Sequence, residues 1–340
     1  MDAASMQRPA IPRQYYEPNL AMALVYFAFS ASFIVLPGYA SVAITKSALD
    51  VWLKVALCLP LIVIAGHGFH LFGWFAHEGI HLSLAKDKYL SMTVGILISG
   101  ITLFPAMGYG ITHWNHHRYT NQDSDPDTKI YPKYRTFWGR FFLARLTANR
   151  GYMRNSILLA LGKLPNKGYT LPFTDAEQRR FAILTLFSLV AWMSGYLFLT
   201  YLDPVAGVVG VFLPILTSIP FTGLRIYLEH NGTDNGVFRD TRTYSSRFYT
   251  FLMFGNNLHL EHHLYPRVPC YHLAKVHRYL RDNGYYDKWR SHIVGGIVEP
   301  LRYVGSDYQY PDPQGRDLVM DPFRVEALSE GAAADRAPAS

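Results

Sequence analysis

The sequence is poor in cysteine, and this limits the kinds of site it can hold. Cys58 and Cys270 are the two cysteines among 340 residues, and they stand far apart in the chain. Two such thiols provide no disulfide framework and no Cys-x-x-Cys pair for a metal. An iron–sulfur cluster held by a set of thiolates is also excluded. We interpret both residues as unpaired thiols.

Charged residues are missing from five long stretches. No Asp, Glu, Lys or Arg occurs in residues 19–45, 55–76, 89–112, 181–202 and 204–224. A helix of about 20 apolar residues spans the roughly 30 Å hydrocarbon core of a bilayer. Five such runs in one chain predict an integral membrane protein. Because Asp2 precedes the first run and no basic segment leads directly into it, we expect that run to remain as a span.

Four of the five runs predict straight transmembrane helices. We place these helices at about residues 20–44, 51–76, 181–202 and 205–228. Their links, 46–50 and 203–204, are short, so the helices are expected to form two hairpins, the second of them tight. The predicted fold class is an all-α integral membrane protein with four transmembrane helices and a cytoplasmic helical cap.

The remaining run, residues 89–112, is predicted to be interfacial or re-entrant. Glycine and proline weaken a straight helix, and this run contains Gly95, Gly100, Pro105, Gly108 and Gly110. A full crossing there would also place the histidine clusters on either side of it on opposite faces of the membrane. With four spans, all the clusters face the same side.

Basic residues gather in loops beside the apolar runs. Residues 128–180 contain eleven Lys or Arg and two acidic residues. Cytoplasmic loops carry such an excess, so the net charge of +7 indicates topology and not a nucleic-acid partner. We predict a cytoplasmic arm at 1–18, a membrane domain with its cytoplasmic cap at 19–300, and a loosely ordered tail at 301–340.

Histidine is concentrated where the apolar runs end. Eight of the 14 histidines lie in three clusters: His77 and His81; His113, His116 and His117; His259, His262 and His263. Positions i and i+4 share a helix face, whereas adjacent positions diverge by about 100°. Adjacent histidines therefore serve two neighbouring ions more easily than one. The repeated His-x-x-His-His pattern predicts two metals.

The choice of metal does not follow from spacing. Neutral imidazole suits zinc, copper, iron and nickel. The alternative of unrelated core or interface histidines is disfavoured, because chance rarely places eight histidines in three short clusters, each at the end of an apolar run.

The clusters resemble the three histidine boxes of the membrane fatty acid desaturase superfamily. HEGIH at 77–81, HWNHH at 113–117 and HLEHH at 259–263 match the boxes. The stretches HHRYTNQDSDPD and EHHLYP also resemble the continuations of boxes two and three, and the likeness covers residues of about 50–285. It implies a cytoplasmic centre of two histidine-bound irons (Fe2+/Fe3+), which uses O2 and two electrons to attack an unactivated C–H bond.

The resemblance also implies a ninth metal ligand after the last span. His230, in YLEHNG, stands at that place. Some relatives have an asparagine four residues before this histidine, but this chain has Ile226. Asn256 and Asn257 are possible substitutes, although capping of a loop is an equally simple interpretation for them.

Acidic residues near the boxes are expected to hold the ligating rings, since a metal-bound histidine usually donates its second N–H to a carboxylate or carbonyl. The candidates in this outer layer are Glu78, Asp123, Asp125, Asp127, Glu229 and Glu261, with Asn257. For Asp125 and Asp127, stabilisation of the Asp-Pro-Asp turn is the alternative. Arg225 is expected to pair with one of these acids or to extend to the membrane interface.

Three further residues lie deeper in the second apolar run. His67, His70 and Trp74 are candidates for a substrate or water path, with an interhelical hydrogen bond as the alternative for the histidines. His272, His277 and His292 stand among Arg and Lys beyond box three and are predicted to be surface residues. No nucleophilic residue is predicted.

The first functional hypothesis is an O2-dependent desaturase that introduces a C=C bond into an acyl chain. The second is a hydroxylase or ketolase acting on a lipid, carotenoid or alkane through the same metal centre. The third is a membrane metal transporter. The third is disfavoured, because transport sites lie near the membrane midplane and these histidines stand at helix ends.

Electrons for such a reaction must come from a separate protein. The sequence has no HPGG haem stretch of the cytochrome b5 type and no Gly-x-Gly-x-x-Gly after a strand. We expect a ferredoxin or cytochrome b5 as donor. The basic segments 129–180 and 267–290 are candidate docking sites, with a topology signal and lipid headgroup contact as the alternative.

Overall fold

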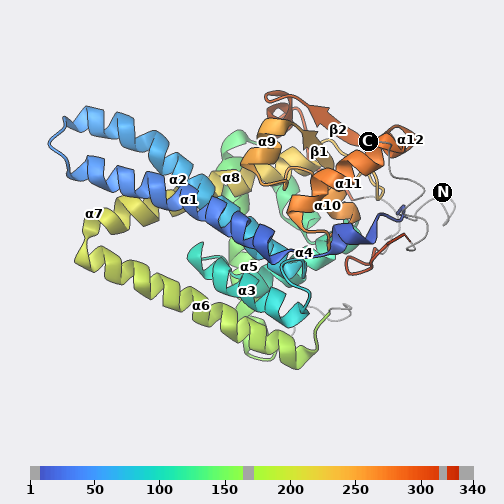
Figure 1. Cartoon of the computed structure of the whole chain (residues 1–340), viewed down its shortest axis with the longest axis horizontal. Helices are drawn as coiled ribbons and strands as arrows, with labels where there is room; N and C mark the ends of the chain where they lie inside the picture. The colour runs from blue at the N-terminus through green and yellow to red at the C-terminus, as the bar shows by residue number, and fades with distance from the viewer. Residues whose placement is uncertain (1–7, 164–171, 314–319, 329–340) are drawn as a thin grey trace.

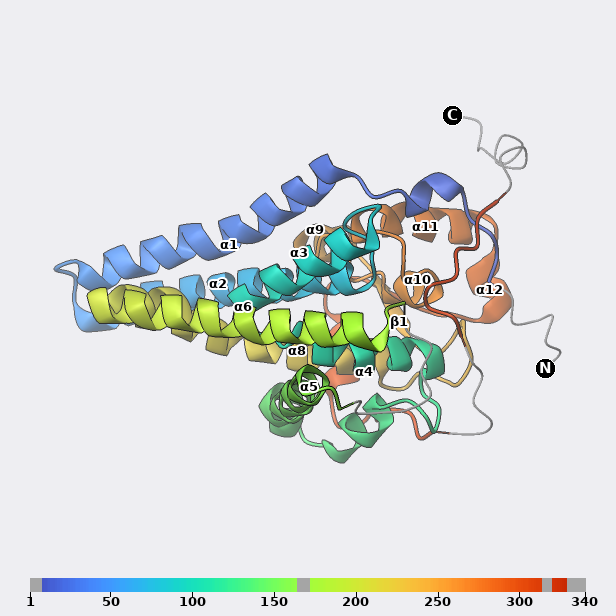
Figure 2. The same ribbon diagram turned by 90° about the horizontal axis from the view of Figure 1, so that it is seen from below.

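The computed structural model describes residues 8–163, 172–313 and 320–328, and this part of the chain is mostly α-helical. Long helices extend to one side, and short helices with two strands gather at the other (Figure 1). We call the second part the cap. The first and the last described segments of the chain both lie at the cap end, far from the tips of the long helices (Figures 1 and 2).

Four helices are long and apolar enough to cross a membrane, as the sequence predicts. They are α1 (Leu20–Lys46), α2 (Val51–Ile80), α6 (Asp175–Leu202) and the continuous segment Pro204–His230. The last comprises α7 (Pro204–Gly207), a π-helix η6 (Val208–Phe212) and α8 (Leu213–His230). Many of their large apolar side chains are exposed, which suits contact with lipid.

Helices α1 and α2 run side by side in opposite directions. The Tyr26 hydroxyl donates to the Leu71 carbonyl at 3.2 Å, and Thr45 Oγ1 lies 3.6 Å from Cys58 Sγ near the other end. The short link is fixed by Asp50, whose side chain accepts from the Trp52 amide and begins α2.

Helices α6 and α8 diverge from their junction at Asp203 (Figure 1), so they are less tightly paired than the two-residue link indicates. Helix α6 lies against α3, where the Tyr196 hydroxyl donates to the Ile101 carbonyl at 2.7 Å. Helix α8 lies against α2, where Thr217 Oγ1 donates to the Ile62 carbonyl at 3.2 Å. Each helix therefore finds its main partner in another part of the chain.

The fifth apolar run is a sharply bent pair and not one straight helix. Helices α3 (Lys88–Ile101) and α4 (Ala106–Tyr119) meet at 117°. Leu103 has a positive φ of 53°, and Pro105 begins the second helix. The bend turns α4 back beside the end of α2, where Trp114 Nε1 donates to the Ile80 carbonyl at 3.1 Å. This confirms that the run does not form a straight span.

The remaining elements are short and belong mostly to the cap and its borders. The helical ones are η2 (Arg13–Tyr16), η3 (Asp127–Lys129), η4 (Tyr131–Lys133), the π-helix η5 (Gly139–Leu143), α5 (Ala144–Ala160), α9 (Arg247–Leu252), α10 (His259–Leu264), α11 (Cys270–Asp282), α12 (Tyr285–Trp289) and η7 (Glu299–Val304).

Two strands also form, which the all-α prediction did not include. Strand β1 (Arg242–Ser245) pairs in parallel with β2 (His292–Gly295), so that Thr243 faces Ile293 in the register. Because β-branched residues favour extended backbone, this small sheet has a local basis in the sequence.

The arm and the tail lie against the cap where the structure describes them. Ile11 is fully buried and forms a bridge with Ala327, while Arg8 Nη1 donates to the Leu264 carbonyl at 2.6 Å. Tyr310 is also buried. Residues 1–7, 314–319 and 329–340 of the predicted arm and tail, and 164–171 of the basic loop, lie outside the described ranges. The division into three regions remains a prediction.

Candidate metal centre

Nine histidines from four helices converge at the junction of the long helices and the cap. His77 lies in the last turn of α2 and His81 directly follows that helix, α4 carries box two, α8 ends at His230, and α10 carries box three. All nine side chains are buried, none being more than 7% exposed. The bend between α3 and α4 is what brings box two beside box one.

Five of these histidines form a first group. Ligand atoms of His77, His81, His113, His117 and His262 all lie within 4.8 Å of one another. His77 Nε2 lies 2.9 Å from His113 Nε2, and His262 Nε2 lies 3.1 Å from His117 Nε2. We call this set group one.

The other four histidines lie next to group one. Ligand atoms of His116, His230 and His263 lie within 4.8 Å of one another. His259 joins them, because its Nε2 lies 3.3 Å from His230 Nε2. We call these four group two. The rings of His117 and His263, one from each group, have centroids 4.1 Å apart.

The adjacent histidines separate as helical geometry predicts. His116 points into group two while His113 and His117, four residues apart, point into group one. His262 and His263 divide between the groups in the same way. The structure thus brings together all nine histidines that the sequence singled out.

The nitrogen atoms of these rings fit bound metal ions. Several are buried without a hydrogen-bond partner among the described residues, including both nitrogens of His81, Nε2 of His116 and Nε2 of His263. Buried polar atoms are normally paired, so such a concentration requires an explanation. Burial also lowers the pKa of His81 to about 3 and that of His262 well below its ordinary value. Both rings are therefore neutral, the form that binds metals.

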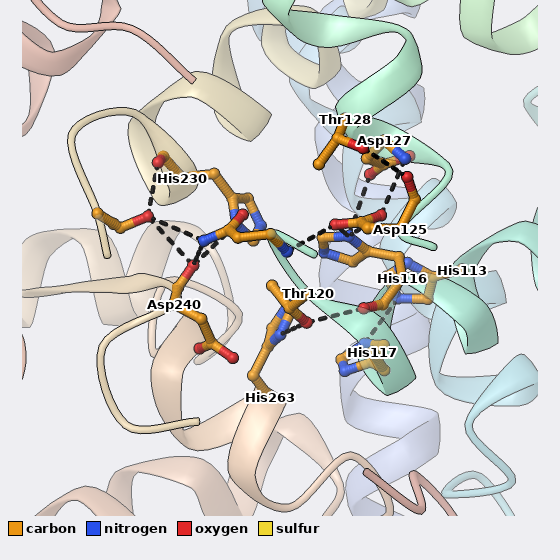
Figure 3. Close-up of polar contacts among 12 residues, drawn as sticks. His113, His116, His117, Thr120, Asp125, Asp127, Thr128, His230, Asp240 and His263 are labelled. Atoms are coloured by element: carbon orange, nitrogen blue, oxygen red, sulfur yellow. Dashed lines mark hydrogen bonds and ion pairs between the residues drawn. The ribbon is translucent and has the colours of Figure 1, made fainter. Parts of the chain in front are cut away.

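His116 differs from the other rings because two carboxylates hold it (Figure 3). Its Nδ1 lies 3.1 Å from both oxygens of Asp125 and 3.5 Å from Asp127 Oδ2. Burial lowers the pKa of His116, but the charges of Asp125 and Asp127 outweigh it and raise the pKa to about 9. Asp125 also accepts from the Asn121 and Asp127 amides at 2.9 Å. Asp125 therefore both stabilises the turn and holds the His116 ring, two roles that the sequence analysis gave as alternatives.

Two contacts in group two were not expected from the sequence. Thr120 Oγ1 lies 3.2 Å from His263 Nδ1, and His230 Nδ1 lies 3.3 Å from the backbone carbonyl of Asp240 (Figure 3). Thr120 follows His116 by four residues, so its place on the same side of α4 could have been predicted from the spacing. The contact with the Asp240 carbonyl could not have been predicted in this way, because a loop supplies that carbonyl.

Glu78 connects box one to the segment after box three. It lies 3.7 Å from His77 Nδ1, and its Oε2 accepts from Ser83 Oγ at 2.9 Å and from the Cys270 amide at 2.8 Å. Glu229 lies 3.3 Å from His259 Nε2 and forms a buried ion pair with Arg225. Arg225 therefore pairs with an acidic residue, which is one of the two alternatives that the sequence left open.

Glu261 and Asn257 do not contact the histidines of the two groups through the hydrogen bonds described. Glu261 accepts from Thr243 Oγ1, from the Tyr286 hydroxyl and from His277 Nδ1, the last at 2.6 Å. Asn257 Nδ2 donates to the Tyr244 carbonyl at 2.8 Å and supports a loop. The exposed Asp123 has no described bond to a box histidine.

The prediction that His277 lies at the surface was wrong. Its residue is 8% exposed, and its ring lies between Glu261 and Ser245. On α11 the basic Lys275 and Arg278 face solvent, whereas His277 lies on the buried face. His272 and His292 are half-buried.

His67, His70 and Trp74 form one hydrogen-bonded chain along α2. His67 Nε2 lies 3.0 Å from the Leu252 carbonyl, the two histidines approach at 3.5 Å, and Trp74 Nε1 donates to His70 Nε2 at 2.9 Å. In the structure, His67 and His70 thus take part in hydrogen bonds, the alternative that the sequence analysis gave for these two histidines. Trp74 alone of the three lines the cavity described next.

A cavity of about 70 Å³ adjoins both groups. Its lining includes His77 and His113 of group one and His116 and His259 of group two. Helices α2 and α8 contribute Gly73, Trp74, Thr222, Arg225, Ile226 and Glu229. The remaining lining residues are Phe104, Tyr109, Asp127, Tyr131, Arg145 and Tyr152. Ile226, where some relatives have asparagine, thus faces the cavity.

Comparison with known proteins agrees with this site. The profile of the fatty acid desaturase family matches residues 50–294. The chain is 27% identical over 294 residues to the sn-1 acyl-lipid omega-3 desaturase (ferredoxin) of Nostoc sp. (strain 36), covering 79% of this chain and 77% of that protein. It is 24% identical over 323 residues to the sn-1 oleoyl-lipid 12-desaturase of Picosynechococcus sp., covering 88% and 89%.

A third relative is the acyl-lipid 8-desaturase of Rebecca salina, 25% identical over 307 residues, or 81% of this chain and 66% of that protein. All three boxes lie within the matched family region. With its apolar helices and its buried histidine cluster, the chain is a membrane-associated oxidoreductase that belongs to the fatty acid desaturase family.

Proposed function

We propose that this protein is an O2-dependent desaturase that introduces a C=C bond into an acyl chain with a centre of two iron ions. The observation that supports it most is the division of nine buried histidines into two adjoining groups beside one cavity. The family supports the reaction class, and the acyl-lipid names of several relatives support the substrate class.

Each group would hold one iron. Group one offers His77, His81, His113, His117 and His262, and group two offers His116, His230, His259 and His263. When bound, such an iron pair supplies an oxidant formed from O2 that takes hydrogen from an unactivated C–H bond. Two external electrons and two protons complete the reduction of O2 to two waters as the chain loses two hydrogens.

The contribution of the protein is to hold the ligands and to position the chain. Asp125 fixes the His116 ring through Nδ1, which leaves Nε2 for the metal. Thr120 and the Asp240 carbonyl do the same for His263 and His230. The cavity would place the substrate carbon beside the histidines.

We propose that the four long helices cross the membrane as two hairpins and that the cap is cytoplasmic. The lengths of the helices and their exposed apolar side chains support the spans. The excess of Lys and Arg in residues 128–180 supports the orientation. With both links at the outer face, all nine histidines lie on the cytoplasmic side.

The electron donor we propose is a ferredoxin, with a cytochrome b5 as the alternative. Three relatives carry ferredoxin in their names. Helix α11 presents Lys275, Arg278 and Arg281 at the surface, while its buried face reaches Glu261 of box three. An acidic donor would find complementary charge there, close to the centre.

Hydroxylation of a lipid, carotenoid or alkane remains the second candidate, because the same centre performs it when oxygen returns to the carbon. Mass spectrometry of lipids decides between the two. A host would express the protein with a ferredoxin and its reductase, and His262→Ala would serve as control. We expect a lipid two hydrogens lighter that is absent from the control. A product that has gained oxygen would contradict desaturation.

A further inference from the structure

Part of the cap surface is apolar. Large apolar side chains are exposed on α9 and on the segment that follows β2, namely Phe248, Phe251, Ile297, Val298 and Leu301. We call these five residues the α9 patch. Phe251 is 66% exposed and Val298 is 70% exposed. A large exposed apolar patch marks a site where a protein binds another protein, a ligand or a membrane.

Local structure brings the members of the α9 patch together. Phe248 and Phe251 are three residues apart, so they share one face of α9. The Tyr249 hydroxyl of the same helix donates to the Ile297 carbonyl, which fixes α9 to the segment after β2. That segment begins with a turn at Gly296, whose φ is 77°. Because loops are normally polar, an exposed Ile-Val pair directly after a turn requires an explanation.

The α9 patch adjoins helices that are long and apolar enough to cross a membrane. The Phe251 ring packs edge-on against Phe29 of α1, with the ring centroids 5.3 Å apart. The Leu252 carbonyl lies 3.0 Å from His67 Nε2 of α2. Figure 1 shows α9 at the side of the cap nearest the long helices. The exposed apolar surface of those helices therefore continues onto the cap.

A second exposed apolar group stands beside α8. It comprises residues just before and within η5, namely Phe137, Trp138 and Leu143, and we call it the η5 patch. A Cβ at Gly223 of α8 would lie 2.9 Å from the carbonyl oxygens of Arg140 and Phe141, so η5 lies directly on α8. The ring centroid of Phe221, two residues before Gly223, is 5.5 Å from that of His67. Both patches thus lie near the depth of His67 along the long helices.

Basic side chains adjoin both patches in the sequence. Arg247 and Arg302 are exposed next to the α9 patch, where Glu299 is the exposed acid. Lys133 and Arg135 are exposed just before the η5 patch. Segments that lie in the surface of a bilayer combine apolar side chains with Lys and Arg, which attract anionic headgroups. Tryptophan, which the η5 patch contains, favours the same boundary.

We propose that the α9 and η5 patches insert into the leaflet on the cap side of the bilayer and bind anionic phospholipid there. The proposal rests on the membrane spans proposed above, but not on the desaturase reaction. Lipid fits better than a protein partner, because both patches lie at one depth beside apolar helices and a soluble protein would have to enter the leaflet to reach them. The cap is thereby attached to the membrane at two places besides the four helices.

A fluorescent label on each patch tests the proposal. Val298→Cys and Trp138→Cys are labelled separately with an environment-sensitive dye in the full-length protein. One protein is placed in each nanodisc of phosphatidylcholine and phosphatidylglycerol with brominated acyl chains. We expect the bromine to quench both labels, because both lie among acyl chains. Cys58 and Cys270 are buried, and the wild type treated with the dye gives their background.

Two further positions serve as controls. A label at Val35→Cys, on an exposed position of α1, should be quenched if α1 crosses the membrane. A label at Arg278→Cys, on the exposed face of α11, should not be quenched. Quenching at position 35 with none at 298 or at 138 would overturn the proposal for that patch and leave the spans intact. No quenching at any of these three positions would overturn the spans as well.

Charge reversal tests the preference for anionic lipid. Arg247→Glu combined with Arg302→Glu, in the Val298→Cys protein, should reduce the quenching in nanodiscs that contain phosphatidylglycerol, because the attraction becomes repulsion. The same protein should be quenched like its parent in nanodiscs of phosphatidylcholine alone. Undiminished quenching in the anionic nanodiscs would overturn the binding of anionic headgroups. Because none of these measurements requires turnover, they stand even if the desaturase assay fails.

Discussion

At the scale of single residues, the side chains that form hydrogen bonds with the histidine rings determine how those rings are oriented toward a metal. His116 is held through Nδ1 by Asp125, and His263 through Nδ1 by Thr120. In both rings Nε2 has no hydrogen-bond partner among the described residues, and ligand atoms of the two histidines lie within 4.8 Å of each other. Glu261, in contrast, holds the back of α10 through Thr243 and His277 and stabilises the helix that carries box three.

Asp125→Asn should weaken the metal site without removing a ligand. The amide keeps the size of the carboxylate but removes the charge that orients His116, and loss of such a partner typically costs about 10–100-fold in metal affinity or activity. Iron titration of the purified variant measures this. Asp123→Asn, at an exposed position of the same loop, should leave the affinity unchanged. Equal affinities for both variants would show that Asp125 only stabilises its turn.

Spacing predicted the grouping of residues that share one helix. His113 and His117 are four apart and face the same group, and the separation of His262 from His263 follows from the same geometry. Contacts between distant segments had no such signal. The Asp240 carbonyl behind His230 and the burial of His277 depend on how a loop and α11 pack against the cap. The basic residues Lys275 and Arg278 beside His277 suggested an exposed segment, but α11 is amphipathic and His277 lies on its buried face.

At the scale of elements, small residues set the close contacts that place the boxes. Helices α2 and α3 touch where Gly79 meets Gly95, and a Cβ at Gly95 would lie 2.8 Å from Gly79 Cα. This contact lies two residues from His77 and His81, and it sets α3, the first helix of the bent pair, directly against α2. The sequence predicted a break in the fifth run from its glycines and Pro105, but not the angle of 117° between α3 and α4.

Gly95→Val should therefore destabilise the protein and disturb the centre. Extra methyl groups in a packed contact cost about 1–3 kcal/mol, and here the neighbour is backbone that cannot rotate away. Thermal unfolding in detergent should show a lower Tm than the wild type. Gly195→Val, where a Cβ meets nothing within 4 Å, should keep the wild-type Tm. An unchanged Tm for Gly95→Val would contradict the α2–α3 packing.

At the scale of the whole molecule, the long apolar helices extend to one side and the cap lies at the other (Figure 2). The nine histidines stand at or beside the ends of α2, α4, α8 and α10. In the function that we propose, a lipid-borne chain reaches the site from the side of the long helices, and a soluble electron donor approaches from the cap. Length and composition predicted the four candidate spans. The divergence of α6 from α8 was not predictable, because each helix has its main contacts elsewhere in the chain.

Charge reversal on α11 tests the donor surface. Replacing Lys275, Arg278 and Arg281 by Glu should slow reduction of the centre by ferredoxin at low ionic strength, because electrostatic attraction raises association rates. Stopped-flow absorbance measures the rate. A small chemical reductant should act at the wild-type rate on the same variant, which separates docking from damage to the site. An unaltered ferredoxin rate would exclude α11 as the docking surface.

The two histidine groups make the most direct claim of this account, and the iron content of the protein tests it. Purified protein would be loaded anaerobically with Fe2+, freed of excess metal and analysed by mass spectrometry for iron per chain. We expect about two irons in the wild type, and about one in His81→Ala, which changes group one, and in His263→Ala, which changes group two. One iron or none in folded wild-type protein, or two in either variant, would contradict the assignment of one metal to each group.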